Sequence, residues 1–170
     1  MSAARQLLMV GGMALALLGM LYGVCYAVFA EHQELDGIGK SLTTSFGAAA
    51  KGDSVAAARA LLEYKEWKYN YDRHVDVHGH WIGLAMVLIL LGIGFDRIGF
   101  REQFKMLLAA LLLFGSFLFP LGVLLQTLTG GFVSQALAVA GSALVIVSLA
   151  GMTVGFAHRQ EPEGRDVNAG

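Results

Sequence analysis

The chain has 170 residues, of which 56% are hydrophobic and only 15% are charged, and its mean hydropathy is +0.61. This composition excludes a soluble domain of this size, and the net charge of −1 argues against a nucleic-acid partner. The single cysteine, Cys25, excludes an intrachain disulfide and a metal site made of cysteines alone. We therefore expect an integral membrane protein that has the lipid bilayer as its main partner.

The first apolar run, Leu7 to Ala30, contains no charged residue. A helix needs about 20 apolar residues to cross a bilayer, so this run is long enough. It is also longer than the apolar region of a secretory signal, which favours a retained first membrane helix. Small residues recur along it at spacings of three or four and form a ridge that lets another helix approach closely. They are Gly12, Ala16, Gly19, Gly23 and Ala27.

The polar segment 31–76 is expected to form a long helical insertion outside the membrane, between the first and second membrane helices. It is far longer than a connection between two helices needs to be. Lys51 to Ser54 marks a turn within it, and Asp53 or Ser54 is the expected N-cap of the helix that follows. Because no breaker follows, this helix is expected to continue into the second membrane span.

Three further apolar runs complete the expected architecture, an all-α membrane domain covering residues 1–170. Each run exceeds the length of a barrel strand, and helices satisfy their own backbone hydrogen bonds within the bilayer. The sequence therefore predicts a four-helix bundle. Its spans are expected at about 7–30, 77–95, 106–129 and 132–157.

Basic residues give the expected orientation of the bundle. The short connection between the second and third spans carries Arg97, Arg101 and Lys105. Short loops weigh most in the positive-inside rule, so this loop and both chain termini are expected in the cytoplasm. The insertion then faces the outside of a bacterial plasma (inner) membrane.

Three of the five histidines lie together at the entrance of the second span, in the segment YNYDRHVDVHGHW. Successive helical residues turn by about 100°, so His74 and His78 share one face of a helix. His80 falls on the opposite face, one turn beyond Asp76. An unbroken helix cannot bring all three imidazoles to one metal ion, and a single three-histidine site would need a break at Gly79.

These histidines are the main candidates for binding chemistry. Imidazole is the commonest side-chain ligand for zinc, copper and haem iron, and ionisable groups at a membrane boundary are functional candidates. We expect haem b or a copper or zinc ion to bind through His78, with help from His74 or His80. Asp76 could ligate the metal or orient His80, and His32 could join from the end of the first helix. The alternative is a purely structural role for the histidines.

The order His78-Gly79-His80, followed by Trp81 to Leu84, resembles the HxH segments of the haem–copper oxidase and nitric oxide reductase superfamily. It is more similar to the HxH helices of small four-helix membrane proteins related to that superfamily and to the NnrS family. In the large enzymes, the two histidines of such a helix point to opposite sides, each toward a different haem. The resemblance implies a haem-binding membrane protein.

The sequence also departs from the large enzymes. The third and fourth spans contain no histidine, so they provide no ligand set for a copper centre. A second axial haem ligand would have to come from His32, from a methionine such as Met20, or from a neighbouring subunit, or be left open. Oxidase or reductase turnover by this chain alone is not expected.

Two functions remain open from the sequence. The first is a haem- or metal-binding protein that belongs to a respiratory or other redox system and takes part in electron transport. The second is a cofactor-free accessory or structural subunit that docks onto other membrane subunits or associates with itself. Neither function makes the chain an enzyme on its own.

Overall fold

The computed structural model describes residues 2–129 and 131–157, and these are almost entirely helical. Four helices are long and apolar enough to cross a membrane: α1, α3, α4 and α5. The predicted all-α fold is therefore confirmed, with four helices that are long and apolar enough to cross a membrane. The C-terminal tail that was expected in the cytoplasm, from His158 onward, lies outside the described residues. The elements are α1 (Ala3–Phe29), α2 (Glu31–Ala50), α3 (Ser54–Gly94), the short 3-10 helix η1 (Phe95–Arg97), α4 (Glu102–Thr129) and α5 (Phe132–Ala157).

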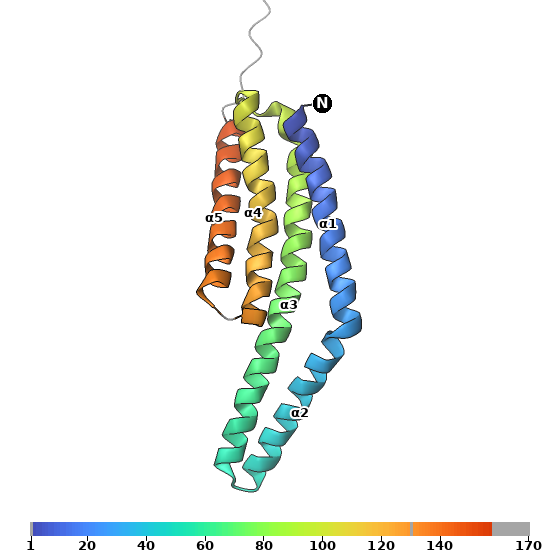
Figure 1. Ribbon diagram of the computed structural model, residues 1–170, viewed down its shortest axis with the longest axis vertical. Coiled ribbons are helices and arrows are strands. Elements are labelled where there is room, and N and C mark those ends of the chain that lie inside the picture. Colours follow the sequence, from blue (N-terminus) through green and yellow to red (C-terminus); the bar gives the residue numbers. More distant parts are fainter. Residues whose placement is uncertain (1, 130, 158–170) are drawn as a thin grey trace, which may run out of the picture.

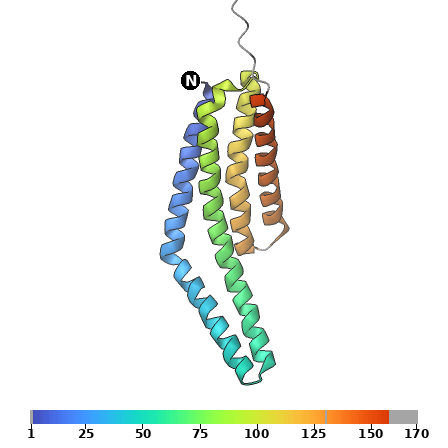
Figure 2. The ribbon, with the colours of Figure 1, turned by 180° about the vertical axis from the view of Figure 1, so that it is seen from behind.

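The four apolar helices stand side by side, and α2 extends beyond them with the first part of α3 as a hairpin (Figure 1). The view from behind shows the same arrangement, with α1 against α3, and α4 against α5 (Figure 2). The N-terminus lies at the end of the bundle opposite the hairpin. The C-terminal end of α4 and the N-terminal end of α5 lie at the end of the bundle from which the hairpin projects.

The segment 31–76 does not form the expected separate insertion, because it consists of α2 and the first part of α3. The predicted continuation of the second helix into the membrane span is confirmed, since α3 runs without a break into the bundle. The physical reason is local: between Ser54 and Asp76 there is no proline or glycine, and alanine, leucine, glutamate and lysine favour a helix. Nothing in the sequence ends the helix where the polar residues give way to apolar ones.

Two backbone features shape the hairpin. Ala30 leaves the helical region at φ −126° and ψ −40°, and α2 starts there in a new direction without a side-chain cap (Figure 1). At the other end, Gly52 adopts φ +77°, a conformation that suits glycine because it has no Cβ. Asp53 then caps α3 by accepting a hydrogen bond of 2.9 Å from the backbone N–H of Ala56. The predicted N-cap is confirmed at Asp53.

The small-residue ridge of α1 packs against α3 of the same chain. A Cβ added at Gly12 would lie 2.8 Å from Cγ1 of Ile89, and one at Gly19 would lie 3.0 Å from Cβ of Trp81. One at Gly23 would lie 2.5 Å from Nδ1 of His78. The ridge therefore serves close helix packing, as predicted, and it sets the distance between α1 and α3.

Glycines also bring α4 and α5 into backbone contact. A Cβ added at Gly122 would collide with the backbone of Ala138, and one at Gly141 would collide with the backbone of Phe119. Backbone atoms cannot move aside as a flexible side chain can. The spacing of α4 and α5 therefore depends on these two positions having no side chain.

Replacing Gly122 by alanine is expected to lower the unfolding temperature of the protein in detergent. The added methyl group would force α4 and α5 apart, at a cost of about 1 to 3 kcal/mol. Gly39→Ala is the matched control, since nothing lies within 4 Å of a Cβ at Gly39 and alanine favours a helix. Thermal unfolding followed by circular dichroism would measure both variants. Equal unfolding temperatures would show that the contact is unimportant.

Candidate functional site

The three clustered histidines lie on two faces of α3, close to the level where α1 ends. His78 faces α1, with its Nδ1 atom 2.9 Å from the carbonyl oxygen of Gly19. His74 also faces α1, and its ring lies 4.8 Å from that of Tyr26. His80 faces α4, where its ring meets Phe119 edge-on at 4.7 Å. The two faces agree with those expected from helical periodicity.

The contact with α1 selects one tautomer of the neutral His78 ring. The carbonyl oxygen of Gly19 can only accept a hydrogen bond, so Nδ1 of His78 carries the hydrogen. The other nitrogen of the neutral ring, Nε2, then has a free lone pair, and it has no hydrogen-bond partner within the described part of the chain. The ring fits against α1 because Gly23 has no Cβ at that point.

A groove between α1 and α3 opens beside His78. Its volume is about 590 Å³. The groove is apolar at the end where Met20 and Ile82 lie. It is more polar near the hairpin, where Tyr26 and Glu31 line it. The residues that line it are Met20, Gly23, Val24, Tyr26, Ala27, Glu31, Val75, His78 and Ile82.

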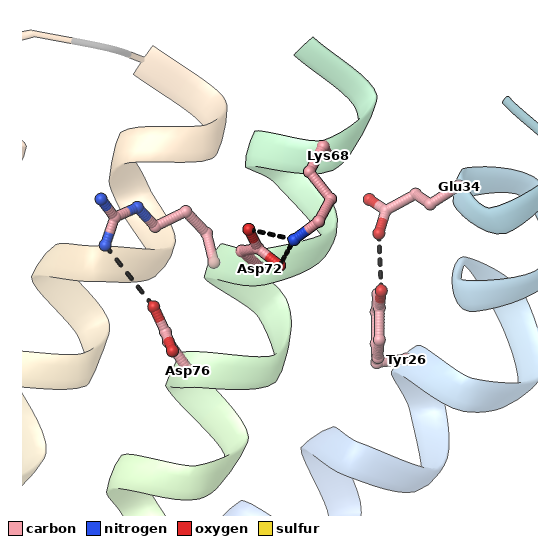
Figure 3. Close-up of polar contacts among 6 residues, drawn as sticks. Tyr26, Glu34, Lys68, Asp72 and Asp76 are labelled. Atoms are coloured by element: carbon pink, nitrogen blue, oxygen red, sulfur yellow. Dashed lines mark hydrogen bonds and ion pairs between the residues drawn. The ribbon is translucent and has the colours of Figure 1, made fainter. Parts of the chain in front are cut away.

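A second polar group, the Glu34 cluster, joins three helices through Tyr22, Tyr26, Glu34 and His74. The hydroxyl of Tyr26 donates a hydrogen bond of 2.6 Å to the carboxylate of Glu34, which Figure 3 shows between α1 and α2. The other carboxylate oxygen of Glu34 lies 3.6 Å from Nε2 of His74. Nδ1 of His74 is 2.5 Å from the hydroxyl of Tyr22. Nδ1 of His74 is thus engaged by Tyr22, and Nε2 faces the Glu34 carboxylate.

His80 is oriented by backbone rather than by a carboxylate. Its Nδ1 atom donates to the carbonyl oxygen of Asp76, at 2.6 Å. The carboxylate of Asp76 instead lies 3.6 Å from the guanidinium of Arg73, the contact drawn at the left of Figure 3. Asp76 therefore orients His80 through its main chain, and its side chain is not directed to the ring.

A second groove lies on the His80 side of α3 and shares Val75 with the His78 groove. It has a volume of about 480 Å³ and is lined by Val75, Asp76, Gly79, His80, Gly83 and Leu84. A Cβ added at Gly79 or Gly83 would meet nothing within 4 Å. This face of α3 is therefore open next to the ring of His80.

The expected ligands do not gather at one point. Among residues 2–129 and 131–157, no three His, Cys, Asp or Glu side chains lie close enough together to hold a metal ion. Gly79 does not break α3, so His78 and His80 stay on opposite sides of one helix. His32 is exposed on α2, where its Nε2 atom lies 3.5 Å from the carboxylate of Asp36.

Sequence reasoning missed Glu34, Tyr22 and Tyr26 as parts of a site. Tyr22 and Tyr26 are one helical turn apart, and they lie close to Gly19 and Gly23 on the face that meets α3. That spacing of two hydroxyl-bearing residues beside a glycine ridge was an available signal. The contribution of Glu34 depends on the bend at Ala30, which no sequence pattern marked.

Replacing Tyr26 by phenylalanine is expected to destabilise the fold. Glu34 is buried, with 8% of its surface exposed, and it would lose the donor to its carboxylate. Losing a hydrogen bond to a charged group costs about 1.5 to 3 kcal/mol, which lowers the unfolding temperature. Tyr64→Phe is the control, because it removes the same hydroxyl from the hairpin, away from this cluster. If thermal unfolding followed by circular dichroism gives both variants the same midpoint, the Tyr26–Glu34 hydrogen bond does not contribute to the stability of the fold.

Comparison with known proteins identifies no relative: no family model, curated protein or solved structure gives a significant match to the chain. The likeness of the histidine segment to HxH helices thus stays a resemblance of a few residues. What bears on function is the geometry of His78, His80 and the Glu34 cluster.

Proposed function

We propose that this protein is a haem-binding membrane component of a redox system, in which Nε2 of His78 is an axial ligand of haem b. The observation that carries the proposal is the hydrogen bond from Nδ1 of His78 to the carbonyl oxygen of Gly19. Metal-ligating histidines almost always donate their second ring N–H in this way, which fixes the ring and raises the basicity of the ligating nitrogen. The free Nε2 and the adjoining groove supply the rest of the site.

The number of protein ligands favours haem over a bare ion. Protein sites for zinc or copper commonly supply three or four side-chain ligands, whereas the porphyrin of haem supplies four nitrogens and leaves one or two positions to the protein. The described residues offer no cluster of three candidate ligands. One fixed imidazole beside a large groove therefore suits haem best. Met20 lines the same groove, and its thioether is a suitable second axial ligand.

The proposed site lies at the extracytoplasmic end of the bundle in a bacterial inner membrane. Arg97 and Arg101 are exposed in the short connection at the opposite end, next to the N-terminus. Because positive residues in short loops stay in the cytoplasm, this end is assigned to the inside. The hairpin of α2 and α3 then extends outside the membrane, and the His78 groove opens near the outer boundary.

Replacing His78 by alanine is expected to abolish haem binding, whereas His80→Ala retains it. His80 is a matched control because its Nδ1 also donates to a backbone carbonyl, but on the opposite face of α3. In protein purified in mild detergent after haem supplementation, the Soret band and the iron content per chain would fall about tenfold or more in the first variant only. Gel filtration would confirm that both variants are folded.

Two results would contradict the proposal. One is a parent protein that holds no haem under these conditions, and the other is a Soret band that persists in His78→Ala. Met20→Ala adds a test of the second ligand. It is expected to retain the Soret band but to give the spectrum of five-coordinate haem.

A cofactor-free accessory subunit is the second candidate, and one observation favours it. The hairpin exposes large apolar side chains beyond the bundle, including Phe46 at 72%, Val55 at 71% and Leu62 at 65%. Such residues, on a part of the chain that is assigned to water, are typical of a protein contact surface.

Under this second function, Phe46→Ser combined with Leu62→Ser is expected to reduce the native size of the complex extracted from membranes. The double variant Thr43→Ala and Thr44→Ala, at two exposed positions of α2, is the control. Blue native electrophoresis would compare them. An unchanged size in the serine variant would remove the support for this candidate.

A further inference from the structure

The Glu34 cluster contains an acid and a base that are largely withdrawn from water. The side chain of Glu34 is 10% exposed and that of His74 is 19% exposed. They come from α2 and α3, and the tyrosines that bind them come from α1. The two side chains lie 3.6 Å apart, and a charge placed near them is only weakly screened because little water surrounds them.

The hydrogen bonds show where a proton can be added. The Tyr26 hydroxyl donates to Glu34, so the carboxylate acts as an acceptor. With the Tyr22 hydroxyl donating to Nδ1, the hydrogen of the neutral His74 ring is on Nε2, which faces Glu34. The lone pair on Nδ1 is then the place for one more proton, and Tyr22 can turn its hydroxyl to accept from it. No heavy atom has to move for this step.

The charged side chains around the pair have contacts of their own. Glu31 and the phenol of Tyr71 act electrostatically on the neighbouring Tyr26, and neither is positive. Lys68 is paired with Asp72, as Figure 3 shows, and Arg73 is paired with Asp76. His74, whose Nε2 lies 3.6 Å from the Glu34 carboxylate, can bring positive charge directly beside it.

The pair also lies next to the proposed haem site. His74 and His78 are four residues apart on one face of α3, and Tyr26 contacts His74 and lines the His78 groove. An added negative charge in that groove is close to both members of the pair. A proton is small enough to reach the Glu34–His74 pair and balance that negative charge.

We propose that the Glu34–His74 pair binds one proton from the outer aqueous phase when the His78 site gains negative charge, so that reduction of the haem is coupled to proton uptake. This inference rests on the proposed function. When haem is bound, a one-electron donor such as a reduced haem protein would supply the electron for this reduction. An N–H bond forms at Nδ1 of His74, and the imidazolium remains paired with the Glu34 carboxylate. One electron and one proton enter together, so the net charge of the region does not change.

Redox titration of the haem-loaded protein tests the coupling. Over part of the range between about pH 6 and pH 8, the reduction equilibrium constant of the haem is expected to change tenfold per pH unit. This corresponds to about 59 mV per pH unit for one electron. In Glu34→Gln the change is expected to be less than about twofold, because the amide cannot stabilise the imidazolium. Glu63→Gln, an exposed position on the hairpin, is expected to keep the parent slope. An unchanged slope in Glu34→Gln overturns the proposal.

A second measurement does not need haem, so it separates this inference from the proposed function. In a His78→Ala background, Val75→Glu places a carboxylate at an exposed position that lines the same groove. Nitrogen-15 NMR of labelled histidine, with the His74 signal identified through His74→Gln, would give the protonated fraction. That fraction is expected to rise about threefold or more near pH 7. Val55→Glu, exposed at the hairpin tip, is expected to leave it unchanged.

The outcomes of the two measurements are distinct. If the protein binds no haem but Val75→Glu still raises the protonated fraction of His74, the proton site is supported and the proposed haem function fails. Equal fractions in the Val75→Glu and Val55→Glu variants overturn the proton site, whether or not haem is bound.

Discussion

The close approach of α1 to α3 is the constraint on which the rest of the structure depends. Gly19 and Gly23 have no side chains to hold the helices apart, so the backbone of α1 comes within hydrogen-bonding distance of the His78 ring. The same approach brings Tyr22 and Tyr26 to His74. The small-residue ridge of α1 thus allows close packing, and the carbonyl of Gly19 on this ridge also selects the tautomer of His78.

The bend at Ala30 is the second determinant of the site. A straight continuation of α1 would carry the next turn away from α3, whereas the change of direction lets α2 pack along the first part of α3 (Figure 1). Glu34 lies in the first turns of α2 and is therefore directed back toward α1 and α3. The polar cluster and the histidine face are thus products of one bend and one helix interface.

Much of this architecture could be predicted from the sequence, because each feature depends on local order. The apolar runs define the membrane helices, and the 100° step per residue places His78 and His80 on opposite faces. The partners of the histidines could not be predicted in this way. Gly19 is 59 residues from His78, and Tyr22 is 52 residues from His74, so their contacts exist only once the helices have packed. A separate insertion was expected from the polarity of residues 31–76, but the predicted continuation of its second helix makes that helix part of the bundle instead.

The unbroken path of α3 makes it one continuous helix about 60 Å long, at about 1.5 Å per residue for its 41 residues. His78 and His80 project from opposite sides of this helix, close to its middle. A rotation of this part of α3 about its axis would therefore displace both rings, one relative to the carbonyl of Gly19 and the other relative to Phe119. The two grooves share one helix, so a rotation of that helix changes both of them.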